Sequence, residues 1–182
     1  MKVDLAAYNN SWYNPGNSVK RFLWYFINQI FFANGFFPIY SLKVFLLKLF
    51  GASIGTNVLI KPCVNIKYPW LLQIGNNVWI GEQVWIDNLA KVTIGNNVCI
   101  SQGALLLCGN HNYKKSSFDL MVGEITLEDG VWICAKVIIT QNVVCKNHSV
   151  ISTGATLNSS TEPYFFYSGN PAIKTGERII VN

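Results

Sequence analysis

Aliphatic residues recur at every sixth position between residues 54 and 157. They stand at Ile54, Ile60 and Ile66, return with the same spacing from Ile74, and resume after a break at Leu127. The pentapeptide pattern IGxNV begins at residues 54, 74 and 94, so a longer period of twenty contains the period of six. Six residues make one short strand and a corner, and three hexads close one triangular coil. The pattern predicts a parallel β-helix in which two extra residues bulge at one corner of each twenty-residue coil.

Positions within each hexad carry distinct roles in this interpretation. The first residue points inward, and the fifth is small or β-branched so that the chain can turn the corner. Gly or Asn between them supplies left-handed backbone angles. A β-sandwich with Asn-Gly turns is the alternative, but it would alternate with a period of two.

The segment before the repeats is apolar but interrupted. Residues 22–42 carry no charge and have about the length of a membrane span, yet Asn28, Gly35 and Pro38 break the run. The next residues show i, i+3, i+4, i+7 spacing at Leu42, Phe45, Leu46 and Leu49. We therefore expect two short amphipathic helices that cap the first coil and can touch a bilayer surface without crossing it. Basic residues flank them at Lys20, Arg21, Lys43 and Lys48.

These patterns divide the chain into three parts. We predict a helical cap over residues 1–52 and a β-helix over residues 53–162 with a protruding loop at residues 108–126. A C-terminal tail covers residues 163–182.

Composition narrows the classes of partner. The formal net charge is +5, but no run of Lys and Arg exceeds two residues, so a nucleic-acid-binding stripe is not expected. The five cysteines form no CxxC pair, and the first sixteen residues lack the apolar core of a signal peptide. Reduced thiols in the cytoplasm are the simplest interpretation, with peripheral attachment to the inner membrane left open.

Several stretches resemble a known family. YNNSWYNPG (8–16), LKVFLLKLFGASIG (42–55), EDGVWICAKVII (128–139), YSGNPAIK (167–174) and the segment from Asn65 to Tyr113 are similar to hexapeptide-repeat acyltransferases, in particular exopolysaccharide (colanic-acid-type) biosynthesis acetyltransferases. The resemblance covers nearly the whole chain. It implies a left-handed coil, a homotrimer, acetyl-CoA as donor, a sugar hydroxyl as acceptor, and a catalytic histidine on a loop that leaves the helix.

The chain has two histidines in different settings. His111 lies in the long interruption of the hexads, within GNHNY, whereas His148 occupies a corner of a regular hexad. Loops that leave a regular scaffold often carry function. A near-neutral pKa suits a histidine to take a proton from a sugar hydroxyl as that oxygen attacks the thioester. We predict that His111 is this general base and that His148 is structural. A loop histidine satisfied by local hydrogen bonds is the alternative.

The sequence defines the residues that orient the histidine and bind the acceptor less clearly. In the family the catalytic histidine is often followed by Asp, but this chain has Asn112, so a backbone carbonyl or the carboxylate of Asp87, Asp119 or Glu124 must orient the imidazole. Asp87 and Asn88, in the coil below the loop, are candidates to bind sugar hydroxyls together with Asn112.

The resemblance also implies a donor site along the later coils. Trp132 and Ala135 match family positions beside the pantetheine arm, and Thr153 matches one whose backbone meets the same arm. Lys174 and Arg178 are candidates for the CoA phosphates. The preceding LNSSTEP departs from the basic segment usual in the family, which weakens the phosphate assignment.

Other functions fit the pattern less well. Zinc could bind Cys108-x2-His111 and Cys145-x2-His148, but Cys145 occupies an inward position, so we expect no metal. Cys108 could form an acyl-enzyme. An antibiotic or a serine could be the acceptor instead of a sugar, and a non-catalytic solenoid scaffold is a further alternative. Flat apolar faces, such as those carrying Trp79 and Trp85, favour assembly into a trimer.

Overall fold

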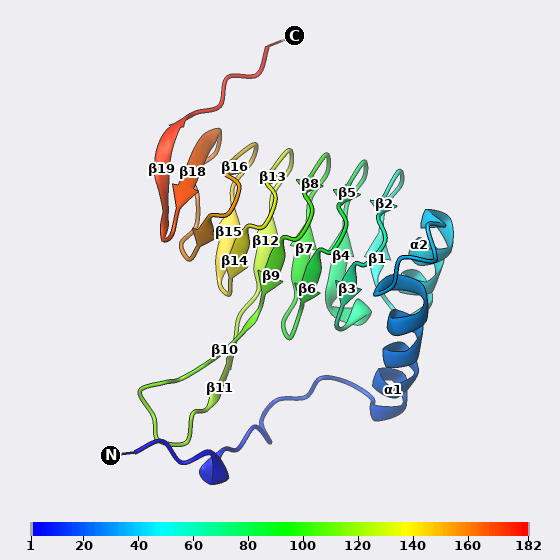
Figure 1. The fold of residues 1–182 in the computed structure, drawn as a ribbon, viewed down its shortest axis with the longest axis vertical. Coiled ribbons are helices and arrows are strands. Elements are labelled where there is room, and N and C mark those ends of the chain that lie inside the picture. The colour runs from blue at the N-terminus through cyan, green and yellow to red at the C-terminus, as the bar shows by residue number, and fades with distance from the viewer. Residues whose placement is uncertain (1, 182) are drawn as a thin grey trace.

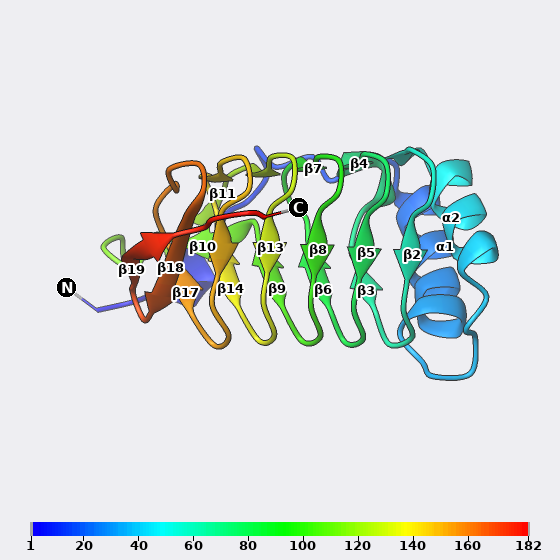
Figure 2. The same ribbon diagram turned by 90° about the horizontal axis from the view of Figure 1, so that it is seen from above.

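The computed structural model describes residues 2–181 and shows a parallel β-solenoid of about six turns (Figure 1). Two helices cover the end where the solenoid begins, and a long hairpin leaves its middle. Viewed from above, the strands of successive coils line up in rows along the solenoid axis (Figure 2). The fold class predicted from the hexads is confirmed.

Three parallel sheets form the sides of the prism. The first contains β1 (Ser53–Ile54), β4 (Leu72–Ile74), β7 (Val92–Ile94), β12 (Ile125–Leu127) and β15 (Val143–Cys145). The second contains β2 (Leu59–Ile60), β5 (Trp79–Ile80), β8 (Cys99–Ile100), β13 (Trp132–Ile133), β16 (Val150–Ile151), β18 (Phe165–Gly169) and the antiparallel β19 (Ala172–Glu177). The third contains β3 (Asn65–Ile66), β6 (Trp85–Asp87), β9 (Leu105–Leu107), β14 (Ile138–Thr140) and β17 (Thr156–Leu157).

Strand register explains the two periods in the sequence. Ile54 pairs with Ile74 and Ile74 with Ile94, a step of twenty, whereas Leu127 pairs with Cys145, a step of eighteen. The step from Ile94 to Leu127 is longer because the hairpin is inserted there. Their side chains form one buried column inside the prism. Because no coil can bury this column alone, stacking holds the coils together.

Corner residues adopt the backbone angles that the hexads predict. Equivalent corners are occupied in successive coils by Asn57, Asn77, Asn97, Gly130 and His148, all with φ between 54° and 69°. Asn and His tolerate this left-handed region better than most residues. His148 therefore stands in a rank of turn residues, and its ring stacks on Tyr164 with centroids 4.7 Å apart.

The helical cap consists of α1 (Ser18–Ile27), the π-helical turn η2 (Asn28–Phe32) and α2 (Tyr40–Leu49). The side chain of Asn17 caps α1 by accepting from the Lys20 amide at 3.1 Å. Trp24 is buried, and its indole Nε1 donates to the Ile66 carbonyl at 2.7 Å. Asn28 is also buried and donates to Asn65 Oδ1 at 2.7 Å. The side of α1 and η2 that carries Trp24 and Asn28 thus docks on the first coil. No helix among residues 2–181 is long and apolar enough to cross a membrane.

An N-terminal arm, residues 2–16, runs beneath the solenoid from α1 to the hairpin (Figure 1). It contains the short helix η1 (Leu5–Ala7). At one end the Asp4 amide donates to the Ser116 carbonyl at 2.8 Å, on the hairpin. Further along, the Tyr13 hydroxyl donates to the Leu89 carbonyl at 2.7 Å, and the Trp70 indole donates to the Pro15 carbonyl at 3.2 Å. The arm closes one side of a cleft whose other walls are the solenoid and the hairpin.

Candidate active site

One corner of the prism carries the insertions of three successive coils. The first insertion includes η3 (Pro69–Leu71), the second lies at residues 88–91, and the third is the hairpin of β10 (Gly109–His111) and β11 (Leu120–Val122). Because the coils are stacked in register, these insertions lie one above another. The residues added to the eighteen-residue coils therefore all lie at one corner of the prism, and the candidate site forms at that corner.

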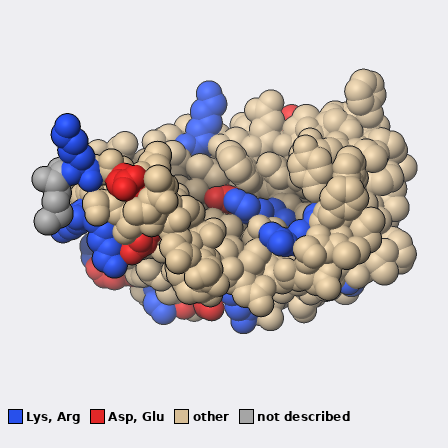
Figure 3. Space-filling view, turned by 90° about the horizontal axis from the view of Figure 1, so that it is seen from below, with Lys and Arg blue, Asp and Glu red and all other residues tan. Residues whose placement is uncertain are grey.

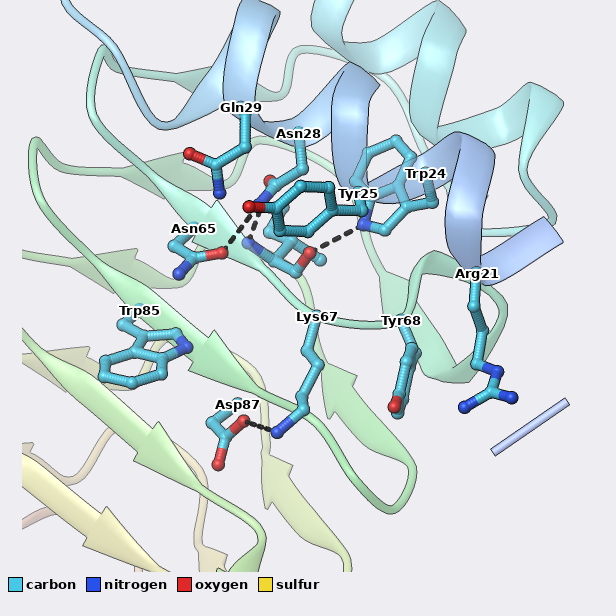
Figure 4. Close-up of a pocket in the computed structure, with 11 residues that line it drawn as sticks. Arg21, Trp24, Tyr25, Asn28, Gln29, Asn65, Lys67, Tyr68, Trp85 and Asp87 are labelled. Carbon is cyan, nitrogen blue, oxygen red and sulfur yellow. Dashed lines mark hydrogen bonds and ion pairs between the residues drawn. The ribbon is translucent and has the colours of Figure 1, made fainter. Parts of the chain in front are cut away.

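A cavity of about 320 Å³ lies between this corner and helix α1 (Figure 4). Its polar lining comes from Arg21 and Gln29 of the cap and from Asn65, Lys67 and Asp87 of the coils. Aromatic side chains complete the lining: Trp24, Tyr25, Tyr68 and Trp85. In the space-filling view, basic and acidic side chains gather in a hollow at the centre of this face (Figure 3).

Asp87 is the acidic residue of this cavity. Its side chain is largely buried, and Oδ1 accepts from Lys67 Nζ at 2.8 Å (Figure 4). Its backbone carbonyl accepts from the Cys108 amide at 3.3 Å, which ties the root of the hairpin to the same residue. The predicted acceptor residue Asp87 thus lines a cavity, and its second carboxylate oxygen has no partner among residues 2–181.

Asn88 has a different environment. It is fully buried, its Oδ1 accepts from the Tyr68 amide at 2.9 Å, and its Nδ2 donates to the Tyr68 carbonyl at 2.6 Å. Both ends of the amide are used to hold the inserted corner of the coil below. We correct the expectation of a direct sugar contact for Asn88: its side chain positions Tyr68.

A second cavity, of about 470 Å³, continues from the first toward the hairpin. The two share Arg21, Lys67 and Tyr68, and the second adds Tyr8 of the arm and Leu120 of the hairpin. Further lining residues are Asn10, Ser11, Tyr13, Pro15 and Leu89. The connected cavities form a path from the cap to the hairpin.

His111 lies next to this path but does not line it: its partner in the hairpin, Leu120, and the nearby Tyr8 line the second cavity. The side chain of His111 lines a separate cavity of about 260 Å³ on the hairpin, together with Asn110, Asn112 and Met121. Its ring is stacked on Phe118, with centroids 4.4 Å apart and planes inclined by 6°, and lies 5.8 Å from the ring of Tyr8. Its Nδ1 is 2.9 Å from the Phe118 carbonyl. A carbonyl oxygen only accepts, so Nδ1 carries the hydrogen, and in the neutral imidazole Nε2 therefore keeps its lone pair. The imidazole is therefore held in the tautomer that a general base acting through Nε2 requires.

The carboxylates considered as orienting groups have other partners or positions. Asp119 accepts from Ser117 Oγ at 2.6 Å and from Lys115 Nζ at 2.9 Å, and these hydrogen bonds hold the pKa of its carboxyl below the usual value. Glu124 is exposed beyond the hairpin. Asn112 uses its side-chain oxygen to accept from the Lys114 amide at 3.1 Å, so it shapes the turn beside His111.

The predicted donor residues lie on later coils. The Gly154 amide donates to the Ala135 carbonyl at 2.9 Å, so Thr153 and Ala135 occupy stacked corners. Trp132 is exposed on β13 and donates to Ser101 Oγ at 3.0 Å. Within residues 2–181 of one chain, no hydrogen bond or ring contact joins these residues to His111.

The tail residues already have partners. Lys174 forms an ion pair with Glu162 at 2.8 Å, which raises the pKa of its ammonium group. Arg178 donates to the carbonyls of Gly130 and His148 at 2.9 and 3.1 Å. Arg178 therefore clamps the tail to the solenoid, and any phosphate would compete with Glu162 for Lys174.

Comparison with known proteins shows the family to which the chain belongs. No family model matches the sequence. The chain is 32% identical over 167 residues, 92% of each protein, to WcaF of Escherichia coli strain K12, which is named provisionally as an acetyltransferase of colanic acid biosynthesis. The chain belongs to the hexapeptide-repeat acetyltransferases.

Solved structures share the fold of this acetyltransferase. A maltose O-acetyltransferase from Clostridium difficile 630 superposes with a TM-score of 0.78 at 19% identity, covering 90% of both chains. A hexapeptide-repeat-containing acetyltransferase from Vibrio cholerae O1 biovar eltor, crystallised with acetyl coenzyme A, superposes with a TM-score of 0.74 at 21% identity. That match covers 80% of this chain and 81% of the other.

Two thiols of the acetyltransferase are fully buried. Cys108 is fully buried, and burial raises the pKa of its thiol to about 12. Burial raises the pKa of the Cys145 thiol as well. No cysteine among residues 2–181 forms a disulfide, and no group of three potential metal ligands lies together there. The cytoplasmic location predicted from the cysteines stays a prediction.

Some lining residues were not found from the sequence of the acetyltransferase. Arg21, Lys67 and Tyr68 were given no acceptor role, and Tyr8 was only part of a family stretch. The two extra residues of the twenty-residue coils could have pointed to Lys67 and Tyr68. Extra residues at a corner that is stacked beneath a loop form the wall of a pocket. Nothing in the local sequence indicates that the arm returns to the hairpin.

Proposed function

We propose that this acetyltransferase moves an acetyl group from acetyl-CoA to a sugar hydroxyl, in the biosynthesis of an exopolysaccharide, with His111 as the general base. The observation that carries the proposal is the hydrogen bond from His111 Nδ1 to the Phe118 carbonyl at 2.9 Å, because it leaves Nε2 free to accept a proton. The names of WcaF and of the maltose O-acetyltransferase support the saccharide acceptor.

Direct transfer needs only one base. Nε2 of His111 takes the hydroxyl proton as the oxygen bonds to the thioester carbonyl carbon. The tetrahedral intermediate then breaks its carbon–sulfur bond, and the CoA thiolate leaves and takes the proton from the imidazolium. An acetyl ester and CoA are the products. A buried, protonated Cys108 thiol is a poor nucleophile, which argues against an acyl-enzyme on that residue.

The two cavities suit a saccharide. Asp87 can accept hydrogen bonds from hydroxyl groups, and Arg21 and Asn65 can donate to ring and hydroxyl oxygens. Trp85 and Tyr68 offer flat faces on which the apolar side of a sugar ring can pack. We assign Asp87 to acceptor binding and Asn112 to the shape of the hairpin beside the reacting hydroxyl.

We further propose a homotrimer with sites shared between neighbours. Outward positions of the second sheet form an apolar ladder whose paired members are Leu59, Trp79, Cys99 and Trp132. Exposed apolar ladders of this kind usually mark an interface. A head-to-tail contact that repeats three times closes into a ring. A neighbour's Trp132, Ala135 and Thr153 would then face His111 across acetyl-CoA, with Lys174 near its phosphates.

Mixed trimers test the shared site. His111→Ala subunits lack the base, and Ala135→Trp subunits carry a blocked donor groove, so each variant alone should be nearly inactive in saccharide-dependent release of CoA. Refolding or co-expressing the two should restore about one quarter of the sites, since each takes its base and its groove from two randomly chosen subunits. Active monomers by light scattering, or no recovery in mixed trimers, would contradict the shared arrangement.

A further inference from the structure

Helix α1 and the turn η2 carry large apolar side chains on two sides. Their inner side docks on the first coil, while Val19, Phe22, Leu23, Phe26 and Ile30 lie on the outer side at positions i, i+3, i+4, i+7 and i+11. All five are exposed, Phe22 by 63% and Phe26 by 48%. An exposed apolar stripe of this length on a helix ordinarily packs against a partner.

Helix α2 packs Leu47 into the core but also exposes apolar side chains. Phe45 and Leu49 are 59% and 65% exposed. Lys43 is buried beside Leu47, with 1% of its surface accessible, and its Nζ donates to the Lys61 carbonyl at 2.9 Å. Burial lowers the pKa of this ammonium group. The structure thus buries a lysine and exposes a phenylalanine on one short helix.

Charge is distributed unevenly around this surface. Residues 5–81 contain no Asp or Glu and six Lys or Arg, whereas the rest of the chain holds eight basic and nine acidic residues. Of the six, Lys20, Lys48 and Lys61 form no ion pair among residues 2–181. In the space-filling view the end that carries the helices is almost wholly free of acidic side chains (Figure 3).

We propose that the outer face of the helical cap docks on an anionic phospholipid bilayer. We call this surface, formed by Val19, Phe22, Leu23, Phe26, Ile30, Phe45 and Leu49, the cap face. Exposed aromatic and aliphatic side chains flanked by unpaired lysines match the interfacial helices that lie in the plane of a membrane. Anionic headgroups complement the positive charge around this face, whereas a second copy of the same face would repel it.

Docking in this way has a consequence for the site. Arg21 and Tyr25 line the first cavity and belong to the same turns of α1 as the cap face. The mouth of that cavity would therefore lie beside the lipid headgroups.

Vesicle sedimentation tests the proposal with the full chain. The protein should pellet with vesicles of phosphatidylcholine and phosphatidylglycerol, pellet much less with phosphatidylcholine alone, and be released by high salt. The double variant Phe22→Ser/Phe26→Ser should bind the anionic vesicles at least about tenfold more weakly, because two rings no longer enter the interface. The control Ile173→Ser removes an equally exposed aliphatic residue from β19, at the far end of the solenoid, and should bind as the unmodified protein does.

Two outcomes would overturn the proposal. Equal pelleting of the double variant and the unmodified protein would show that the cap face does not touch lipid. A fall in the solution mass of the double variant, without vesicles, would show that the face joins copies of this chain. Turnover of acetyl-CoA with a water-soluble saccharide should be the same in the double variant, so loss of vesicle binding is separable from failure of the proposed enzyme activity.

Discussion

Replacing His111 with alanine is expected to lower kcat for acetyl transfer by about 10²–10⁴-fold. The barrier would rise by about 3–5 kcal/mol, since each 1.36 kcal/mol changes a rate tenfold. The affinity for acetyl-CoA and the melting temperature should remain near those of the unmodified protein, because the half-buried ring lies on a hairpin outside the solenoid core. Steady-state CoA release and calorimetric titration with a non-hydrolysable acetyl-CoA analogue measure the two effects separately.

His148 provides the matched control. Its φ of 58° makes alanine a poor replacement, whereas asparagine occupies the equivalent corner at Asn57, Asn77 and Asn97. His148→Asn should therefore keep both fold and kcat. Equal loss of activity in the His111 and His148 variants would contradict a single loop base.

Asp87→Asn is expected to lower kcat/KM for the saccharide by about 10–100-fold, the range expected when a charged hydrogen-bond partner is lost. The exchange keeps the shape of the side chain but removes the charge that faces the cavity. The KM for acetyl-CoA should change little, because the donor residues lie on later coils. Varying each substrate in turn at saturating levels of the other measures both constants.

The ion pair between Glu128 and Lys146 offers a control for this variant. Its 2.9 Å distance is close to the 2.8 Å between Lys67 and Asp87, but it lies outside both cavities. Glu128→Gln should leave saccharide kinetics unchanged. If it weakens saccharide use as much as Asp87→Asn does, the loss reflects stability of the coils and the acceptor assignment of Asp87 is wrong.

The solenoid was predictable because its determinants are local and repeated. Each coil needs an inward aliphatic residue, a compact residue at the corner and a residue that tolerates left-handed backbone angles. All three can be read from the sequence of each hexad. The position of His111 outside the repeats followed from the same regularity. The left-handed sense was inferred from the family resemblance, since spacing alone is the same for either hand.

Contacts made by backbone groups could not be read from the sequence. His111 is oriented by the Phe118 carbonyl, and every residue carries a carbonyl, so residue identity gave no signal. The path of the N-terminal arm depends on the hydrogen bond between Tyr13 and the Leu89 carbonyl, seventy-six residues apart. The amphipathic pattern of α2 was visible, but the exposure of Phe45 and Leu49 and the burial of Lys43 run against the usual rule.

The central claim is direct transfer of the acetyl group to a saccharide hydroxyl, and the fate of that group tests it most directly. A single turnover with isotopically labelled acetyl-CoA, quenched and analysed by mass spectrometry over free sugars, nucleotide sugars, polysaccharide intermediates, serine and aminoglycosides, would follow it. We predict one labelled O-acetyl ester on a saccharide for each CoA released, and no label on the protein. Label retained on Cys108, transfer to serine or an aminoglycoside in place of every saccharide, or no acceptor-dependent release of CoA would contradict the account.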